Sequence, residues 1–233
     1  MTTQRAVATQ PGAGQQTARE PKLPDPPRKK DMQQRRSLSI MDGTLLPHFA
    51  HRRDVLVSGG GYLCFRTTDH PNTRLEPDVV VAFGVNPGEI IADNGYVIND
   101  VGKPPDFVLE VASRSTGRRD YTVKREGYAH FGVGEYWRFD HTGGQYQDAP
   151  LAGDLLVNGQ YEPIDLADDR PGKMSEMLSG YSPALDLYLC WDNGKLRFYD
   201  PKTDEFLMDP EELEAALADA QKRIRQLETE LGR

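Results

Sequence analysis

The chain has 233 residues, of which 37% are hydrophobic and 27% are charged, and its formal net charge is −8. This length accommodates one compact domain of about 150 residues with flanking segments. No apolar run approaches the ~20 residues of a membrane span. The polar N-terminus lacks the apolar core of a secretion signal, so we expect a cytoplasmic protein without membrane contact. Two cysteines, Cys64 and Cys190, are too few for a disulfide framework and are expected to be reduced, buried thiols.

The charge is unevenly distributed along the chain. Residues 1–53 contain 10 Lys and Arg against 4 Asp and Glu, whereas the remainder contains 18 against 32. An acidic body argues against a broad nucleic-acid-binding surface, but it is compatible with a carboxylate site for a divalent cation. Residues 1–36 are rich in Gln, Pro, Gly, Arg and Lys and are predicted to form a disordered basic tail. The tail is either solvated or an electrostatic arm for an acidic partner.

The central domain is expected to span residues 37–208. A helical spacing of apolar residues predicts a short helix within 41–53. Runs of β-branched and aromatic residues predict strands at 54–58, 62–65, 77–83, 95–98, 104–113, 135–140 and, more weakly, 161–164. The turn sequence Asp192-Asn193-Gly194 predicts a hairpin between strands at 185–191 and 195–199.

Residues 209–233 are predicted to form an amphipathic helix that begins at Pro210, because proline suits the first helical turn. An isolated helix of this length is marginally stable, so its apolar stripe needs a partner. We favour a homodimer through residues 211–232, with packing against the chain's own domain as the alternative. The stripe has the a/d spacing of about three heptads and consists of Leu213, Leu217, Ala220, Ile224, Leu227 and Leu231.

A carboxylate interrupts the apolar strand predicted at 104–113. Side chains alternate between the two faces of a strand, so Glu110 shares one face with Val108 and Ala112. A buried carboxylate costs several kcal/mol unless it is paired or binds a metal. The residues alone leave open an edge strand with Glu110 in water, a structural ion pair, or a functional site.

Two further side chains bear on this choice. Asp78 stands at the mouth of the strand predicted at 77–83. Lys124 lies in a helix predicted from Tyr121 to Phe131, with Asp120 as its N-cap, and the helical spacing puts this lysine on the aromatic, inward face. The alternative is a lysine whose stem packs on the aromatic residues while its amine reaches solvent.

Asp78, Glu110 and Lys124 together predict metal-assisted hydrolysis of a phosphodiester. Two carboxylates from neighbouring strands suit Mg²⁺ or Mn²⁺, and a nearby lysine can stabilise negative charge or promote deprotonation of a metal-bound water. The five histidines have no zinc-ligand spacing, and the chain has neither a Gly-x-Ser-x-Gly motif nor a phosphate-binding glycine-rich loop.

The order and spacing of these residues resemble a known family, the Uma-type restriction endonucleases, bacterial members of the PD-(D/E)XK nuclease superfamily. The similarity spans roughly residues 45–165, and the coiled-coil-like tail also resembles tails appended in this family. It implies an α/β, restriction-endonuclease-like core: a mixed central sheet flanked by helices, plus a C-terminal coiled-coil-like helix. The matching residues are Pro77-Asp78, 105–113, Ser115-Thr116, Asp120, Lys124, Tyr128, Gly132-Val133, Glu135-Tyr136-Trp137 and Asp140.

The resemblance also implies roles for individual residues. Asp78, Glu110 and the main-chain carbonyl of Val111 would hold Mg²⁺ or Mn²⁺, and Lys124 would take the part of the superfamily's catalytic lysine. The chain departs from the superfamily pattern at Ala112, where the strand lysine would stand. The leading hypothesis is a metal-dependent endonuclease that hydrolyses DNA. The alternative is an inactive nuclease-like module that binds nucleic acid or protein and dimerises through its C-terminal helix.

Three arginines border the expected site. Arg118, Arg119 and Arg125 are candidates to contact the phosphates of a nucleic acid, for which DNA is favoured over RNA. The alternative for all three is solvated surface charge.

Overall fold

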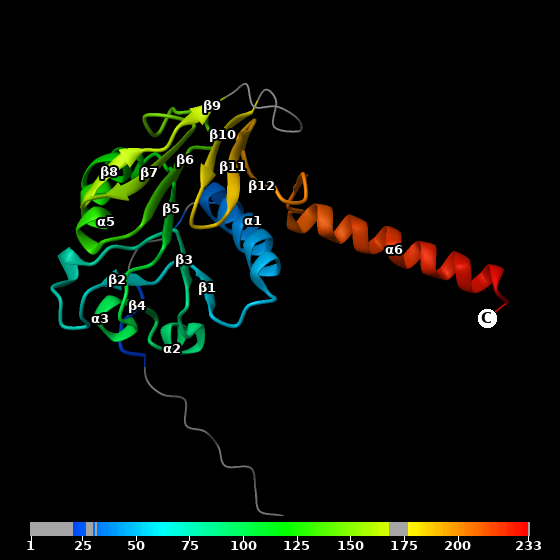
Figure 1. The fold of residues 1–233 in the computed structure, drawn as a ribbon, viewed down its shortest axis with the longest axis horizontal. Helices are drawn as coiled ribbons and strands as arrows, with labels where there is room; N and C mark the ends of the chain where they lie inside the picture. Colours follow the sequence, from blue (N-terminus) through cyan, green and yellow to red (C-terminus); the bar gives the residue numbers. More distant parts are fainter. Residues whose placement is uncertain (1–20, 27–29, 31, 168–176, 233) are drawn as a thin grey trace, which may run out of the picture.

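The computed structural model describes residues 21–26, 30, 32–167 and 177–232 (Figure 1). The rest of the predicted tail, at 1–20, 27–29 and 31, lies outside the described residues. Within the described part, the prediction of disorder up to residue 36 is wrong. Leu23 is 2% exposed and packs against a small cluster beside the main core, and a helix begins at Met32.

Helix α1 (Met32–Phe49) starts earlier than the helix predicted within 41–53. Its buried face opens with two polar residues, Gln34 and Ser37, before the apolar Met41 and Leu45 follow at the same helical spacing. The apolar periodicity therefore identified only the second half of the helix.

The central sheet is mixed, as predicted, with the strand order β1-β3-β5-β6-β7-β8. Strands β5 and β6 run parallel, and all other neighbouring strands in this sheet run antiparallel. β3, β5 and β6 lie inside the sheet and are covered on both faces, which explains their nearly continuous apolar runs. The strands are β1 (Val55–Ser58), β3 (Val79–Phe83), β5 (Phe107–Val111), β6 (Glu135–Phe139), β7 (Leu151–Val157) and β8 (Gln160–Pro163).

A second, antiparallel sheet packs on one face of the central sheet and does not extend it (Figure 1). The predicted hairpin is confirmed between β11 and β12, where Asn193 and Gly194 both have positive φ, at 47° and 88°. The sheet has the order β13-β12-β11-β10-β9 and consists of β9 (Leu166–Ala167), β10 (Leu178–Ser182), β11 (Leu187–Asp192), β12 (Lys195–Asp200) and β13 (Glu205–Phe206).

Two apolar layers enclose the central sheet. On one face, Phe107, Leu109 and Val111 of β5 pack with α1 and the second sheet. On the other face, Val108 packs with the layer of short elements around α5, so the predicted alternation along β5 is confirmed. These elements are β2 (Tyr62–Cys64), α2 (Pro87–Ala92), β4 (Gly95–Val97), α3 (Ile98–Val101) and α5 (Arg125–Phe131). The short 3-10 helix η1 (Pro71–Thr73), between β2 and β3, has no buried residue.

The helix after β5 differs from its prediction at its start. One continuous helical segment runs through α4 (Gly117–Arg119), a π-helical turn η2 (Asp120–Lys124) and α5, and it ends at Gly132 with a φ of 78°. The prediction that Asp120 is the N-cap is wrong, because Asp120 lies within this segment and is fully buried.

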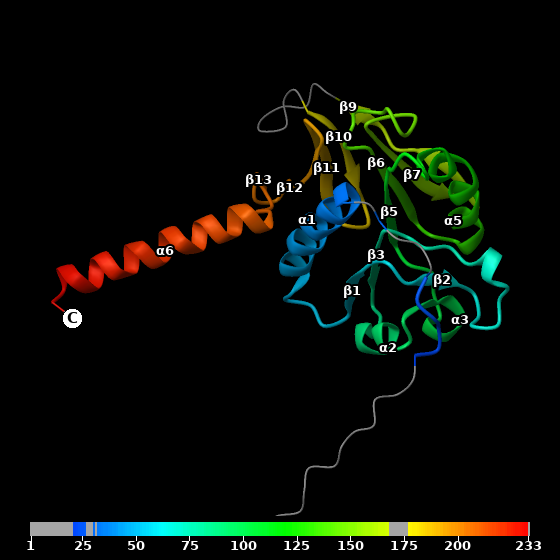
Figure 2. The ribbon, with the colours of Figure 1, turned by 180° about the vertical axis from the view of Figure 1, so that it is seen from behind.

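Helix α6 (Pro210–Glu230) begins with a capping box in which Asp209 and Glu212 bond each other's main-chain N–H groups. Its first turn lies against α1, since a Cβ on Gly43 would collide with the ring of Pro210. Beyond this junction α6 extends away from the body, and none of its residues is buried (Figures 1 and 2).

The cysteines and the hydrophobicity of the helices can be compared with what the sequence predicted. Both cysteines are free and fully buried, and burial raises the pKa of the Cys64 thiol to about 11. Of the helices in the described ranges, none combines the length and apolar character that crossing a bilayer would require.

Candidate active site

Glu110 lies in β5 between two neighbouring strands, which excludes the edge-strand alternative. Its side chain is fully buried and points toward α5. One carboxylate oxygen, Oε1, accepts a hydrogen bond from the Tyr128 hydroxyl at 2.5 Å. The other, Oε2, lies 2.6 Å from Nζ of Lys124. The carboxylate is therefore held by two groups from the same helical segment.

Lys124 faces inward at the end of the π-helical turn, as its helical spacing predicted. Its side chain is only 6% exposed, and its Nζ lies 3.0 Å from Oδ1 of Asp120 in addition to the contact with Glu110. Lys124 thus bridges two buried carboxylates, which excludes a lysine whose amine reaches solvent. π-Helical turns of this kind occur frequently at functional sites.

Asp78 is joined to β5 next to Glu110. It directly precedes β3 and is buried, and its Oδ2 accepts a hydrogen bond of 2.8 Å from the main-chain N–H of Val111. Because Val111 follows Glu110 in β5, this bond brings the two carboxylates together. The close approach of Gly59 to the same place needs a glycine, since a Cβ there would collide with the carbonyl oxygen of Asp78.

Two residues that the sequence did not assign to the site also contact it. Lys30 places its Nζ 2.5 Å from Oδ1 of Asp78. Gln34, in the first turns of α1, donates a hydrogen bond of 3.0 Å from Nε2 to the carbonyl oxygen of Val111. The available signal for Gln34 was its position on the helix face that continues to Met41. Lys30 belongs to the basic run Arg28-Lys29-Lys30, for which the sequence offered a solvated tail or an electrostatic arm but no contact with Asp78.

The site concentrates unlike charges in a largely buried environment. Asp78, Glu110 and Asp120 face the ammonium groups of Lys30 and Lys124, so the five side chains carry a formal charge of −1. Burial is the largest influence on Glu110 and raises its pKa, Lys124 opposes that rise, and the two other carboxylates add to it. The carboxyl of Glu110 consequently holds a proton more readily than an exposed glutamate.

The donor set fits a hard divalent cation. Asp78, Glu110 and the carbonyl of Val111 offer only oxygen, as Mg²⁺ and Mn²⁺ prefer, and a small number of protein ligands is usual for Mg²⁺, which keeps several waters. Within the described ranges, no group of three or more His, Cys, Asp and Glu side chains is arranged to hold a metal ion. The carbonyl of Val111 belongs to the expected ligand set through the resemblance described above.

The three arginines differ in their surroundings. Arg118 and Arg119 are exposed at the start of the helical segment that carries Lys124. Arg125 instead donates from Nη2 to Oδ1 of Asp154 and to the carbonyl oxygen of Tyr161, both at 2.8 Å. The guanidinium of Arg125 thus fastens α5 to β7 and β8, which leaves Arg118 and Arg119 as the candidates for phosphate contacts.

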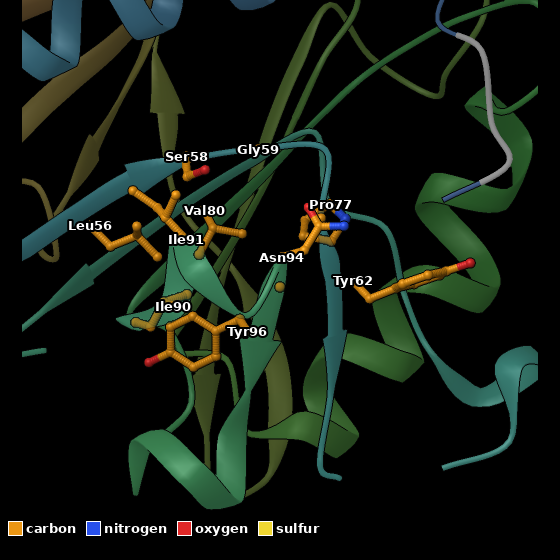
Figure 3. A pocket seen from close by; sticks show the side chains of 12 residues that line it. Leu56, Ser58, Gly59, Tyr62, Pro77, Val80, Ile90, Ile91, Asn94 and Tyr96 are labelled. Carbon is orange, nitrogen blue, oxygen red and sulfur yellow. The ribbon is translucent and has the colours of Figure 1, made fainter. Parts of the chain in front are cut away.

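A cavity of about 110 Å³ lies between Pro77 and helix α2 (Figure 3). Figure 3 shows apolar side chains such as Val80 and Ile90 along one side and Asn94 and Pro77 along the other. Among the residues that the structure describes, the lining includes no charged side chain. Glu110 and Lys124 do not line it either. The cavity is therefore separate from the ionic cluster, the name used here for Lys30, Asp78, Glu110, Asp120 and Lys124.

Comparison with known proteins places these residues in a family. A family model described as "Uma2: Putative restriction endonuclease" matches residues 32–187, a range that includes Asp78, Glu110 and Lys124. A comparison with curated proteins gives no match. Among solved structures, a putative nuclease belonging to DUF820 from Anabaena variabilis is similar at 16% sequence identity and a TM-score of 0.41, covering 74% of this chain and 84% of that one. The family match covers more than half of the chain and confirms the resemblance found in the sequence: the protein belongs to the Uma2 family of restriction-endonuclease-like proteins.

Proposed function

We propose that this protein is a metal-dependent endonuclease that hydrolyses phosphodiester bonds in DNA. The observation that carries the proposal is the convergence of three side chains, from the residue before β3, from β5 and from the following helical segment. Nζ of Lys124 lies 2.6 Å from Glu110, and Asp78 bonds the main chain of the next residue in β5. Membership in a family of restriction-endonuclease-like proteins supports the same chemistry.

In this proposal, Asp78, Glu110 and the carbonyl of Val111 hold Mg²⁺ or Mn²⁺. When bound, such an ion polarises the phosphate and lowers the pKa of a water ligand. Tyr128 orients Glu110 by donating to one carboxylate oxygen, while the other oxygen faces Lys124. Burial and the neighbouring Glu110 raise the pKa of Tyr128, so it remains a hydroxyl donor.

Lys124 supplies a positive charge next to the phosphate that is cleaved. Its ammonium is almost fully buried, where an electrostatic interaction is stronger than in water, and it is held in place by two carboxylates. A charge fixed in this way stabilises the negative charge that develops on the phosphoryl oxygens without reorganisation during the reaction. Arg118 and Arg119 are the proposed phosphate contacts of the flanking nucleic acid.

The test is plasmid nicking by the purified full chain. We expect the wild type to nick supercoiled DNA with Mg²⁺ or Mn²⁺ and to stop when EDTA is added. Asp78→Asn removes a ligand charge and is expected to lower the rate by at least ~100-fold, the usual scale of one lost electrostatic interaction at a reacting centre. Glu162→Gln, on the exposed edge of β8, is the matched control and should cleave like the wild type.

The possible failures are distinguishable. A wild type that cuts neither DNA nor RNA with either ion would contradict the enzyme and favour the nuclease-like binding module. Cleavage that persists unchanged in Asp78→Asn would assign the activity to a different site or to a contaminant.

We further propose that the protein is a homodimer that associates through residues 211–232. The apolar stripe of α6 is solvent-exposed along its length, from 40% at Leu227 to 74% at Leu231. The body contacts this helix at its first turn, through Gly43 and an ion pair of 3.5 Å between Arg36 and Glu211. A second copy of the helix would bury the remaining stripe.

The charges beside the stripe favour a parallel pair. In a parallel pair, Arg223 of one helix faces Glu228 of the other, which gives two attractive pairs. A fully overlapped antiparallel pair would place Glu214 against Glu228 and Arg223 against itself. Ile224 at a central a position with leucine at a neighbouring d position also favours two strands.

Ile224→Asp should dissociate this dimer. The substitution buries an unpaired carboxylate in the seam of each helix, and we expect at least ~100-fold weaker self-association. Gln226→Asp introduces the same charge on the outward face of α6 and is the control. Sedimentation velocity of both variants and the wild type measures the effect. A wild type that is monomeric at all concentrations would contradict the dimer.

A further inference from the structure

A lysine from before α1 occupies the first carboxylate of the proposed metal site. Nζ of Lys30 lies 2.5 Å from Oδ1 of Asp78, and the two residues are separated by 48 positions in the sequence. The Asp78 side chain is fully buried, whereas the Lys30 side chain is 19% exposed. The ammonium therefore enters the site from its solvent side.

The same stretch of chain also covers the main-chain ligand. Gln34 donates to the carbonyl oxygen of Val111 at 3.0 Å. Two of the three proposed ligand groups, the Asp78 carboxylate and this carbonyl, are thus satisfied by donors that lie four residues apart. These two donors stand where a cation would otherwise interact with both oxygens.

Lys124 and Lys30 differ in how easily a divalent cation could replace their ammonium groups. Lys124 is 6% exposed and contacts two carboxylates, so withdrawing it would leave both without their shared cation. Lys30 contacts Asp78 from a partly exposed position, and its long stem allows the amine to move into water at small cost. Lys30 is consequently the cation that can leave.

We propose that Lys30 is a built-in counterion of Asp78 that a divalent cation must displace, so that Lys30 sets the affinity of the site for metal. The proposal rests on the function proposed above. An ammonium and a divalent ion cannot both lie against one carboxylate oxygen without strong repulsion. Replacing Lys30 by a divalent ion also changes the formal charge of the cluster from −1 to neutral, which favours the exchange.

The displaced lysine gives the site two stable forms. Without metal, Lys30 compensates the buried Asp78 and Gln34 satisfies the Val111 carbonyl, so the fold does not hold an uncompensated acid cluster. With metal, the cation takes over both tasks. Removing the lysine should therefore harm the metal-free protein and help metal binding.

Calorimetric titration with MnCl₂ tests this in three proteins: the wild type, Lys30→Met and Lys22→Met. Lys22 belongs to the same N-terminal segment but pairs with Asp93 at 3.0 Å and Asp100 at 2.6 Å, so it is the matched control. We expect Lys30→Met to bind Mn²⁺ about tenfold more tightly than the other two. Its melting temperature should be lower than that of the wild type without metal and should rise more on addition of Mn²⁺.

The outcomes distinguish a failure of the counterion role of Lys30 from a failure of the proposed metal-dependent function. An Mn²⁺ affinity of Lys30→Met that equals or falls below that of the wild type overturns the role of Lys30 while leaving the metal site intact. Binding by Lys30→Met but not by the wild type supports the role of Lys30 most strongly. Absence of Mn²⁺ binding in all three proteins contradicts the proposed metal-dependent function and this inference with it.

Discussion

A Lys124→Met variant is expected to lose DNA cleavage by at least ~100-fold, because the buried ammonium beside Glu110 disappears from the reacting centre. Methionine retains most of the volume of the lysine stem, so packing against Tyr128 and its neighbours should survive. Single-turnover cleavage of a labelled duplex with Mn²⁺ measures the rate of the chemical step. A rate within a few-fold of the wild type would contradict a catalytic role for Lys124.

The same substitution carries a structural cost that has to be separated from the catalytic one. Glu110 and Asp120 lose their shared cation, and breaking a buried ion pair costs roughly 3–5 kcal/mol of stability. Adding Asp120→Asn returns the formal charge of the ionic cluster to its wild-type value. We expect the double variant to regain most of its resistance to urea but not its activity. Recovery of cleavage in the double variant would show that Lys124 acts only on stability.

Trp137→Ala is expected to destabilise the fold by roughly 3–5 kcal/mol, the usual cost of removing a large aromatic side chain from a core. Trp137 is fully buried in β6, beside the strand that carries Glu110. Cβ atoms added to Gly153 or Gly180 would lie 2.9 Å from its ring, so the indole fills the space between two strands that come from different sheets. Its Nε1 also donates to the buried Glu135 at 3.0 Å.

Trp191→Ala is the matched control for this prediction. Trp191 is only partly buried in β11, although its Nε1 likewise donates a hydrogen bond, to the carbonyl of Asp140 at 2.9 Å. We expect a loss of about 2 kcal/mol or less, because less apolar surface is buried. Urea denaturation followed by circular dichroism compares the variants. Equal losses for the two tryptophans would contradict the central position assigned to Trp137.

The strands whose residues pack on both faces were all predicted, whereas some of the less buried strands were missed. β3, β5 and β6 have long apolar runs, and each was predicted. β7 was missed because Gly153 and Asp154 interrupt its apolar pattern. Gly153 is required there by the ring of Trp137, a contact between residues 16 positions apart that no local pattern records. The start of α1 was missed for a related reason, since Gln34 bonds β5 and therefore breaks the apolar stripe.

The candidate site was predictable in part. Asp78, Glu110 and Lys124 are each unusual in their local pattern, and the hypothesis that they form one site came from combining these three signals. Asp120 was assigned to a cap because aspartate before a helical run usually caps it. The π-helical turn instead brings Asp120 against Lys124. Lys30 was not predictable, because only the tertiary fold brings it to Asp78.

Helix α1 contacts both the candidate site and the base of helix α6. Near its N-terminus it bonds the Val111 carbonyl through Gln34, and farther along it contacts the base of α6 through Gly43 and Pro210. These positions are nine residues apart, about 14 Å along a helix. In the proposed dimer, a change in the angle of α6 is expected to act first on the helix that holds Gln34 against the Val111 carbonyl. One helix therefore contacts both a proposed ligand oxygen and the base of the proposed dimerisation helix.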